Sequence, residues 1–147
     1  MKAVLFAAAA LLLSACSETT GPRADLRVET SKAVYTLQGP GNPAALVEYS
    51  VRNTGSESVS LPQCGPVIGE LQRREGSGWV TVASGPCAMD LAIYAPLVLE
   101  PGEAAFGETY VNAAGRYRFR VHAAEEVGQE FTAYATSPEF VVRWLED

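Results

Sequence analysis

Residues 44–61 read AALVEYSVRNTGSESVSL, and this stretch indicates the fold of the chain. Apolar and polar side chains alternate over residues 44–52, which places them on opposite faces of an extended strand. The residues Asn53-Thr54-Gly55 then supply a turn into a second short strand at residues 56–61. We expect these two strands to pair with each other and to bury the face that carries Ala45, Val47, Tyr49 and Val51.

Short segments with the same alternation recur after residue 25, separated by clusters of Gly, Pro, Asn and Ser. No segment has a convincing helical stripe, so the pattern predicts an all-β sandwich or barrel in one domain, residues 26–147. Residues 33–37 should continue the first edge strand, and residues 75–78 should turn a hairpin. The other strands are expected at residues 26–30, 67–74, 78–83, 88–94, 97–99, 104–111, 116–122, 131–136 and 140–144, around a core of Val47, Tyr49, Val51, Trp79, Tyr117, Phe119 and Phe140.

Residues 1–15 have the layout of a secretory signal peptide, with Lys2 before an uncharged apolar run at residues 3–13. At about 1.5 Å per residue, a helix over this run covers roughly half of a hydrocarbon core of about 30 Å. The run is therefore too short for an ordinary membrane span. We expect an export signal that is cleaved after Ala15.

Residues 13–16, Leu-Ser-Ala-Cys, resemble the lipobox of bacterial lipoproteins. The resemblance implies that the Cys16 thiol receives a diacylglyceryl group and anchors the chain to a membrane, with residues 16–25 as a flexible tether. Ser17 stands where an aspartate commonly retains such proteins in the inner membrane. The cell envelope is thus the expected location, and the outer membrane is favoured, on its periplasmic side or at the cell surface. The alternative is a plain secreted protein in which Cys16 is a free or paired thiol.

The formal net charge is −6 for the whole chain and −7 once Lys2 is removed, and the charges are not gathered in blocks. An acidic chain repels the phosphates of nucleic acids and of anionic lipid headgroups, so neither is expected as a general partner. No second apolar run approaches spanning length.

Two cysteines remain after lipidation, Cys64 and Cys87, and disulfides persist where exported proteins reside. We expect these two to form a disulfide, which stabilises the fold by roughly 3 kcal/mol in the chain-entropy model. The alternative is a metal site, which needs more ligands. Neither cysteine belongs to a Cys-x-x-Cys pair and His122 is the only histidine, so no metal or cofactor is predicted.

Six landmarks follow one another in a familiar order: VEYSVRNTG at residues 47–55, SVSLPQC at 58–64, Trp79, LVLEPGEAAF at 97–106, AAGRYRFRV at 113–121 and SPEFVV at 137–142. Their order and spacing resemble the immunoglobulin-like domains of bacterial envelope proteins, including the BsuPI intracellular proteinase inhibitor family. The resemblance covers roughly residues 26–143 and implies an immunoglobulin-like antiparallel β-sandwich. It also implies structural roles for the Asn53-Thr54-Gly55 turn, for the Pro101-Gly102-Glu103 turn and for Tyr117.

A search for catalytic patterns favours a protein that is not an enzyme. His122 ends an expected strand in phase with three arginines, so a surface histidine is a better interpretation than a member of a Ser-His-acid triad. Neither a Gly-x-Ser-x-Gly, a His-Glu-x-x-His nor a phosphate-binding glycine loop occurs. The spacing of a calcium loop is also missing from the acidic residues Asp90, Glu125, Glu126 and Glu130.

Arg116, Arg118 and Arg120 occupy alternate positions of one expected strand and therefore share a face. Adjacent guanidinium groups repel one another unless carboxylates or a ligand lie among them. One interpretation is an anion-binding stripe for a phosphate, an acidic glycan or an acidic partner. The interpretation that we prefer is cross-strand pairing with glutamates such as Glu108 or Glu139.

Three functions follow from these observations. The leading hypothesis is a non-catalytic binding or structural module, anchored through Cys16, that contacts an envelope protein or a cell-wall component through a sheet edge or loops. The alternative is a proteinase inhibitor that presents residues 62–66 or 85–88, which prolines and the expected disulfide would rigidify. A hydrolase is the third and least supported hypothesis.

Lipidation at Cys16 predicts that labelled palmitate is incorporated into the wild-type chain and not into Cys16→Ser. The variant should also accumulate as an uncleaved precursor, because the signal peptidase of lipoproteins acts after the thiol is modified. Gel mobility and label measured on the same immunoprecipitate report both effects. Equal labelling of the two chains would contradict the lipobox interpretation.

The expected disulfide predicts fewer than one reactive thiol per chain when the oxidised, delipidated protein is titrated in denaturant. Reduction should then lower the free energy of unfolding by a few kcal/mol, because the unfolded chain regains the freedom that the bridge removes. A Cys64→Ser/Cys87→Ser variant is the control, since its stability should not respond to reductant. Two reactive thiols in the oxidised wild type would rule out the bridge.

Overall fold

The computed structural model describes residues 24–38, 43–62, 68–84, 95–125 and 130–145. These residues form eleven strands and contain no helix. The strands are β1 (Leu26–Thr30), β2 (Val34–Leu37), β3 (Ala45–Asn53), β4 (Val59–Leu61), β5 (Glu70–Glu75), β6 (Gly78–Ser84), β7 (Leu97–Leu99), β8 (Ala104–Val111), β9 (Gly115–Ala123), β10 (Ala133–Thr136) and β11 (Phe140–Trp144). The strand expected at residues 88–94 lies outside the described residues.

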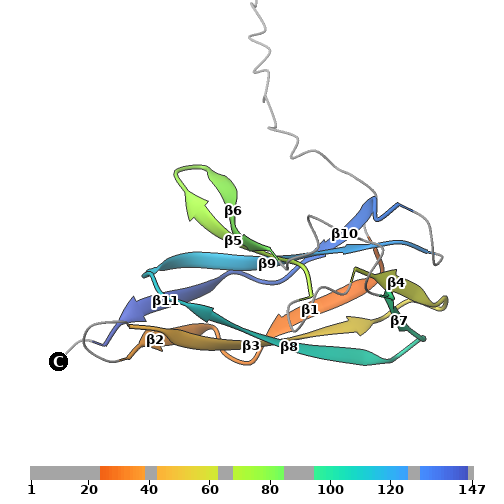
Figure 1. The fold of residues 1–147 in the computed structure, drawn as a ribbon, viewed down its shortest axis with the longest axis horizontal. Helices are drawn as coiled ribbons and strands as arrows, with labels where there is room; N and C mark the ends of the chain where they lie inside the picture. The colour runs from red at the N-terminus through yellow and green to blue at the C-terminus, as the bar shows by residue number, and fades with distance from the viewer. Residues whose placement is uncertain (1–23, 39–42, 63–67, 85–94, 126–129, 146–147) are drawn as a thin grey trace, which may run out of the picture.

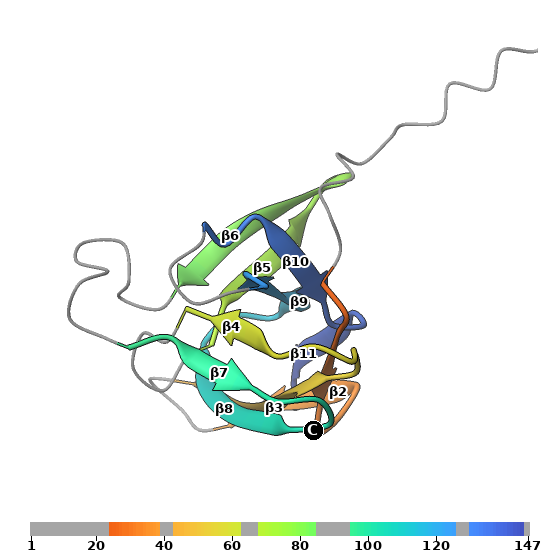
Figure 2. The same ribbon diagram turned by 90° about the vertical axis from the view of Figure 1, so that its right-hand side faces the viewer.

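Two sheets stack to form the predicted β-sandwich. One sheet has the order β1-β3-β8 and the other β2-β11-β9-β5-β6, with β10 beside β9. Figure 1 shows β3 and β8 in the lower layer and β9 and β11 in the upper layer. The short pair of β4 and β7 lies at one end of the sandwich (Figures 1 and 2). The all-β, immunoglobulin-like expectation is confirmed, because the sheet orders are those of strands A-B-E and G-F-C in such domains.

The first edge strand is divided between the sheets, which corrects the prediction that residues 33–37 simply continue it. β1 pairs antiparallel with β3, whereas β2 pairs with β11 in the opposite sheet and runs parallel to it. The break is held on both sides, because Ser31 N donates to Glu48 O and Val141 N donates to Ala33 O. Every other described strand pair is antiparallel.

The expected pairing of residues 44–52 with residues 56–61 is wrong, and the buried side chain of Asn53 explains why. Its Nδ2 donates to Glu57 O at 2.7 Å and to Leu99 O at 2.9 Å, while its Oδ1 accepts from Gly55 N at 2.9 Å. These hydrogen bonds attach the turn at residues 53–57 to Leu99 of β7, so the chain after the turn runs beside β7 and not beside β3. As a result β4 pairs with β7, and the neighbours of β3 are β1 and β8.

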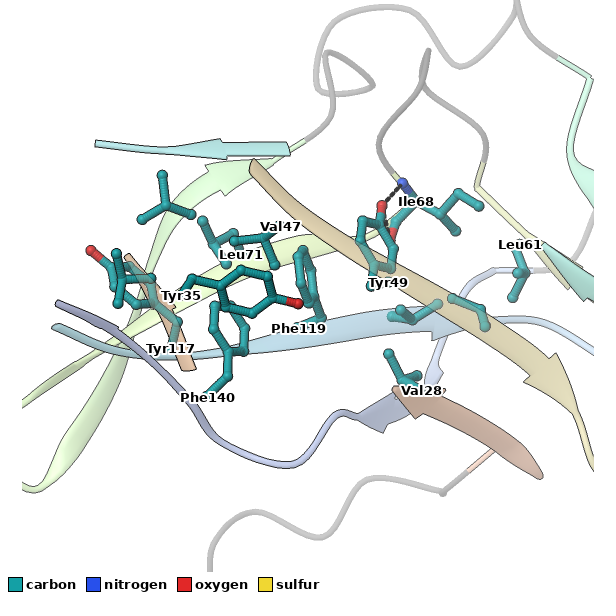
Figure 3. Close-up of a cluster of buried hydrophobic side chains, with 14 of the residues drawn as sticks. Val28, Tyr35, Val47, Tyr49, Leu61, Ile68, Leu71, Tyr117, Phe119 and Phe140 are labelled. Atoms are coloured by element: carbon teal, nitrogen blue, oxygen red, sulfur yellow. Dashed lines mark hydrogen bonds between the residues drawn. The ribbon is translucent and has the colours of Figure 1, made fainter. Parts of the chain in front are cut away.

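The core lies between the sheets and contains six of the seven residues predicted for it, shown in part in Figure 3. Phe119, Phe140 and Val47 are fully buried, and Tyr117 donates its hydroxyl hydrogen to Ala113 O at 2.9 Å at the start of β9. That bond confirms a structural role for Tyr117. Trp79 is the exception. Its ring lies beside Arg74, its cross-strand partner, and beside Arg118, which is on the outer face of β9. Trp79 therefore faces away from the core.

Tyr49 links the two sheets through both its ring and its hydroxyl group. The ring stacks on Phe119, with centroids 4.0 Å apart, and the hydroxyl accepts from Ile68 N at 2.6 Å and donates to Ile68 O at 3.2 Å (Figure 3). Burial raises the pKa of this hydroxyl, although the Ile68 hydrogen bond acts in the opposite direction. On the β8 side the ring fills the space above Gly107, where an added Cβ would come within 2.5 Å of it.

This contact predicts that Gly107→Ala destabilises the chain by about 1–3 kcal/mol, the usual cost of forcing an extra methyl group into a packed core. Urea unfolding followed by circular dichroism measures the change. Gly78→Ala is the matched control, because an added Cβ there meets its nearest atom, Glu75 O, at 3.9 Å. If Gly107→Ala unfolded at the same urea concentration as the control, the proposed packing of Tyr49 against β8 would be refuted.

Candidate functional site

The three arginines singled out from the sequence lie on β9 and face outward. They alternate with Tyr117, Phe119 and Val121, which are buried in the core, as predicted. Arg116 is exposed, whereas Arg118 and Arg120 are half-buried. The stripe therefore occupies the outer face of the larger sheet, between β11 and β10 on one side and β5 on the other.

Each of these arginines contacts a group on a neighbouring strand. Arg116 pairs with Glu139 at 2.7 Å, which confirms one of the two carboxylates predicted as partners. The other, Glu108, was a wrong choice because β8 belongs to the opposite sheet. Arg118 donates from Nε to Gln72 Oε1 at 2.9 Å, and the guanidinium of Arg120 lies 4.3 Å from the ring centroid of Tyr134.

Trp79 connects the protruding hairpin to this stripe. The guanidinium of Arg118 lies 4.4 Å from the indole centroid and that of Arg74 lies 5.4 Å from it. Stacking on the π face of an indole stabilises a guanidinium and shields its apolar surface from water. Side-chain contacts thus connect the outer face of β9 to β5 and β6. Anion binding by Arg116, Arg118 and Arg120 remains a prediction.

His122 continues the same face and lies beside Glu70 of β5, with Nε2 and Oε1 3.7 Å apart. Its side chain is 28% exposed, in keeping with the expectation of a surface histidine at the end of a strand. The carboxylate of Glu70 also accepts from Thr81 Oγ1 at 3.2 Å, so it is engaged with β6 as well. The arrangement is that of a cross-strand polar network.

The opposite face of the sandwich carries a feature that the sequence analysis missed. On β8, an edge strand of its sheet, Phe106 is 78% exposed and Tyr110 is 70% exposed, which are large values for aromatic side chains. Residues two apart on a strand lie about 6.8 Å apart on one face. The two rings therefore flank Glu108 along a line of about 14 Å. We call Leu46, Glu48, Phe106, Glu108 and Tyr110 the aromatic–acidic face.

The phase of β8 explains why these rings face outward. Position 107 faces the core, where the absence of a side chain leaves room for the ring of Tyr49. Alternation along the strand then directs Phe106, Glu108 and Tyr110 away from the core. The sequence did contain a signal. Residues 105, 107 and 109 are Ala, Gly and Thr, whereas the two aromatic side chains of this strand, Phe106 and Tyr110, occupy the other set of alternate positions.

Carboxylates lie between and beside the exposed rings. Glu48 on β3 and Glu108 on β8 are direct cross-strand partners, and both are exposed. Like charges in this position repel and destabilise a sheet. A hollow of about 410 Å³ adjoins them, lined by Glu29, Thr30, Ser31, Glu48, Tyr49, Ser50 and Phe106.

The part of the chain that the structure describes contains no group of three His, Cys, Asp or Glu residues that could hold a metal ion. Within the same residues, no helix is long and apolar enough to cross a membrane. The signal peptide, Cys16, Cys64 and Cys87 lie outside the described residues, as do residues 85–88 and most of residues 62–66. Lipidation, the disulfide and the inhibitor loops therefore stay predictions.

No protein-family model and no curated protein sequence matches the chain. Solved structures with a similar arrangement include a candidate lipoprotein, ycdA, of Bacillus subtilis subsp. subtilis str. 168, at 15% identity and a TM-score of 0.44, covering 83% of this chain and 38% of that one. Another is the Northeast Structural Genomics Consortium target SoR45, at 16% identity and a TM-score of 0.43, covering 81% of this chain and 86% of that one.

A third is a β-glucosidase from Kluyveromyces marxianus in complex with glucose, at 15% identity and a TM-score of 0.28, covering 83% of this chain and 15% of that one. This chain thus spans less than two thirds of the length of the first and third of these proteins. Likeness this remote assigns no activity to the chain.

Proposed function

We propose that this chain is a non-catalytic binding module of the bacterial cell envelope, held on a membrane by a lipid on Cys16, and that it binds through the aromatic–acidic face. The observation that carries the binding role is the exposure of Phe106 and Tyr110, 78% and 70%, on one face of one strand. Water-exposed rings held together on a rigid sheet supply contact area at a small cost in conformational entropy. Two exposed rings on one face of a strand exceed the scattered single apolar side chains of an ordinary surface, and exposed apolar groups that gather in this way mark interaction sites.

The anchoring part of the proposal is supported by the sequence. The apolar run at residues 3–13 is too short to span a membrane. Residues 13–16, Leu-Ser-Ala-Cys, follow the order of a lipobox, in which the cysteine is the residue that receives the lipid. Ser17 supports delivery to the outer membrane. About ten residues of tether, rich in polar residues, would let the sandwich reach partners near the membrane surface.

A photocrosslinking scan tests the binding role. We expect benzoylphenylalanine at residue 106 or 110 to give a discrete crosslinked species when intact cells are illuminated, because these side chains would be covered by the partner. Residue 144 is the matched control, since Trp144 on β11 is an aromatic residue with 55% exposure in the opposite sheet. Immunoblotting of the solubilised envelope reads out the products.

Two outcomes contradict the proposal. Crosslinks that are as frequent at residue 144 as at residues 106 and 110 would mean that the aromatic–acidic face is not a preferred contact surface. Crosslinks at residue 144 alone would move the contact to the sheet that contains β11.

A further inference from the structure

We propose that the occupant of the aromatic–acidic face is an extended, basic polypeptide segment whose lysine or arginine side chains sit beside Glu48 and Glu108 and over the rings of Phe106 and Tyr110. This inference rests on the proposed function, in that it takes the face to be the contact surface. It adds the chemistry of the partner, which the exposure of the rings does not specify by itself.

The opposed carboxylates indicate a cation. Glu48 and Glu108 face each other across β3 and β8, at a spacing that brings Cβ atoms within about 4.5–5.5 Å. Glu48 receives a long contact from Ser31 Oγ at 3.5 Å, a hydroxyl that leaves the negative charge in place. A cation between the two carboxylates would replace their repulsion with two charge-assisted hydrogen bonds.

Charges elsewhere on the same sheet show where the cation belongs. Arg27 and Arg52 are cross-strand partners at the other end of the outward face. Arg27 pairs with Glu29 at 2.6 Å, and Arg52 donates from NH1 to Gly102 O at 2.6 Å. Arg52 is therefore held at the Gly102 end, whereas Arg27 is the counter-ion of Glu29, which lines the hollow next to Glu48 and Phe106. The half of the face with Glu48 and Glu108 keeps the negative charge.

The aromatic rings favour the same partner. A lysine or arginine within about 6 Å of a ring centroid is attracted by the ring quadrupole, and its aliphatic stem packs on the apolar surface. Phe106, Glu108 and Tyr110 lie in line at about 6.8 Å intervals. Alternate side chains of an extended peptide have the same interval, so such a peptide can present a cationic side chain at each step. The negative charge of the chain as a whole, −7 after loss of residues 1–15, adds attraction at long range.

Fluorescence anisotropy of fluorescein-labelled hexalysine, titrated with the full chain purified in detergent, tests the partner chemistry. We expect the association constant to fall about tenfold or more in Glu48→Gln/Glu108→Gln and in Phe106→Ser/Tyr110→Ser, and to fall with added salt. Labelled hexaglutamate should not bind. The charge-matched control is Glu57→Gln/Glu100→Gln, which removes two negative charges from exposed positions elsewhere and should keep binding within about threefold of the wild type.

Equal weakening in the charge-matched control, or no binding of hexalysine by the wild type, would overturn the cationic partner. The two proposals fail separately. If hexalysine does not bind, yet crosslinking at residues 106 and 110 persists, the face remains a contact surface and its partner is of another class. Binding of a neutral N-acetylglucosamine hexamer that is lost in Phe106→Ser/Tyr110→Ser would assign that class to a glycan. Retained thermal unfolding midpoints in the variants confirm that each one folds.

Discussion

The packing of Tyr49 against Gly107 and Phe119 is the constraint on which the rest of the structure depends. The ring occupies the gap between the sheets, and its hydroxyl satisfies both backbone groups of the buried residue Ile68. Because only glycine fits opposite the ring, β8 has a single possible phase. That phase places small side chains inside and directs Phe106 and Tyr110 into solvent.

A second constraint concerns how the chain passes between the sheets. Asn53 is fully buried and its amide replaces the hydrogen bonds that a hairpin would have made, so the chain leaves β3 and crosses the end of the sandwich. Residues 31–33 carry the chain from β1 in one sheet to β2 in the other. Buried backbone groups require hydrogen-bond partners. At the crossing from β1 to β2, Ser31 N donates to Glu48 O of β3 and Ala33 O accepts from Val141 N of β11.

The two outer faces of the sandwich differ in how their charges are arranged. On the β9 face, guanidinium groups lie on a carboxylate, an amide and two aromatic rings of the same chain, which fastens the β5–β6 hairpin to the sheet. On the β8 face, Glu48 opposes Glu108 between exposed rings. The first arrangement is internally complementary except at Arg120 Nε, which is buried without a hydrogen-bond partner among the described residues, whereas the second is complementary to a positively charged surface from outside.

The sequence by itself determined the burial of residues such as Val47, Tyr49 and Phe119 and the sharing of one face by the arginines of β9, because side-chain direction in a strand has a local period of two. It also determined the turn at Gly102, because glycine adopts the φ of 83° found there without strain. The tertiary structure alone decided the pairing of β4 with β7 and the exclusion of Trp79 from the core. Local alternation does not say which face is buried where both faces carry apolar side chains, as with Trp79 and Val80 on β6, and it does not say which strand lies beside another. That choice depends on contacts between residues far apart in the chain, such as Tyr49 with Gly107 and Asn53 with Leu99.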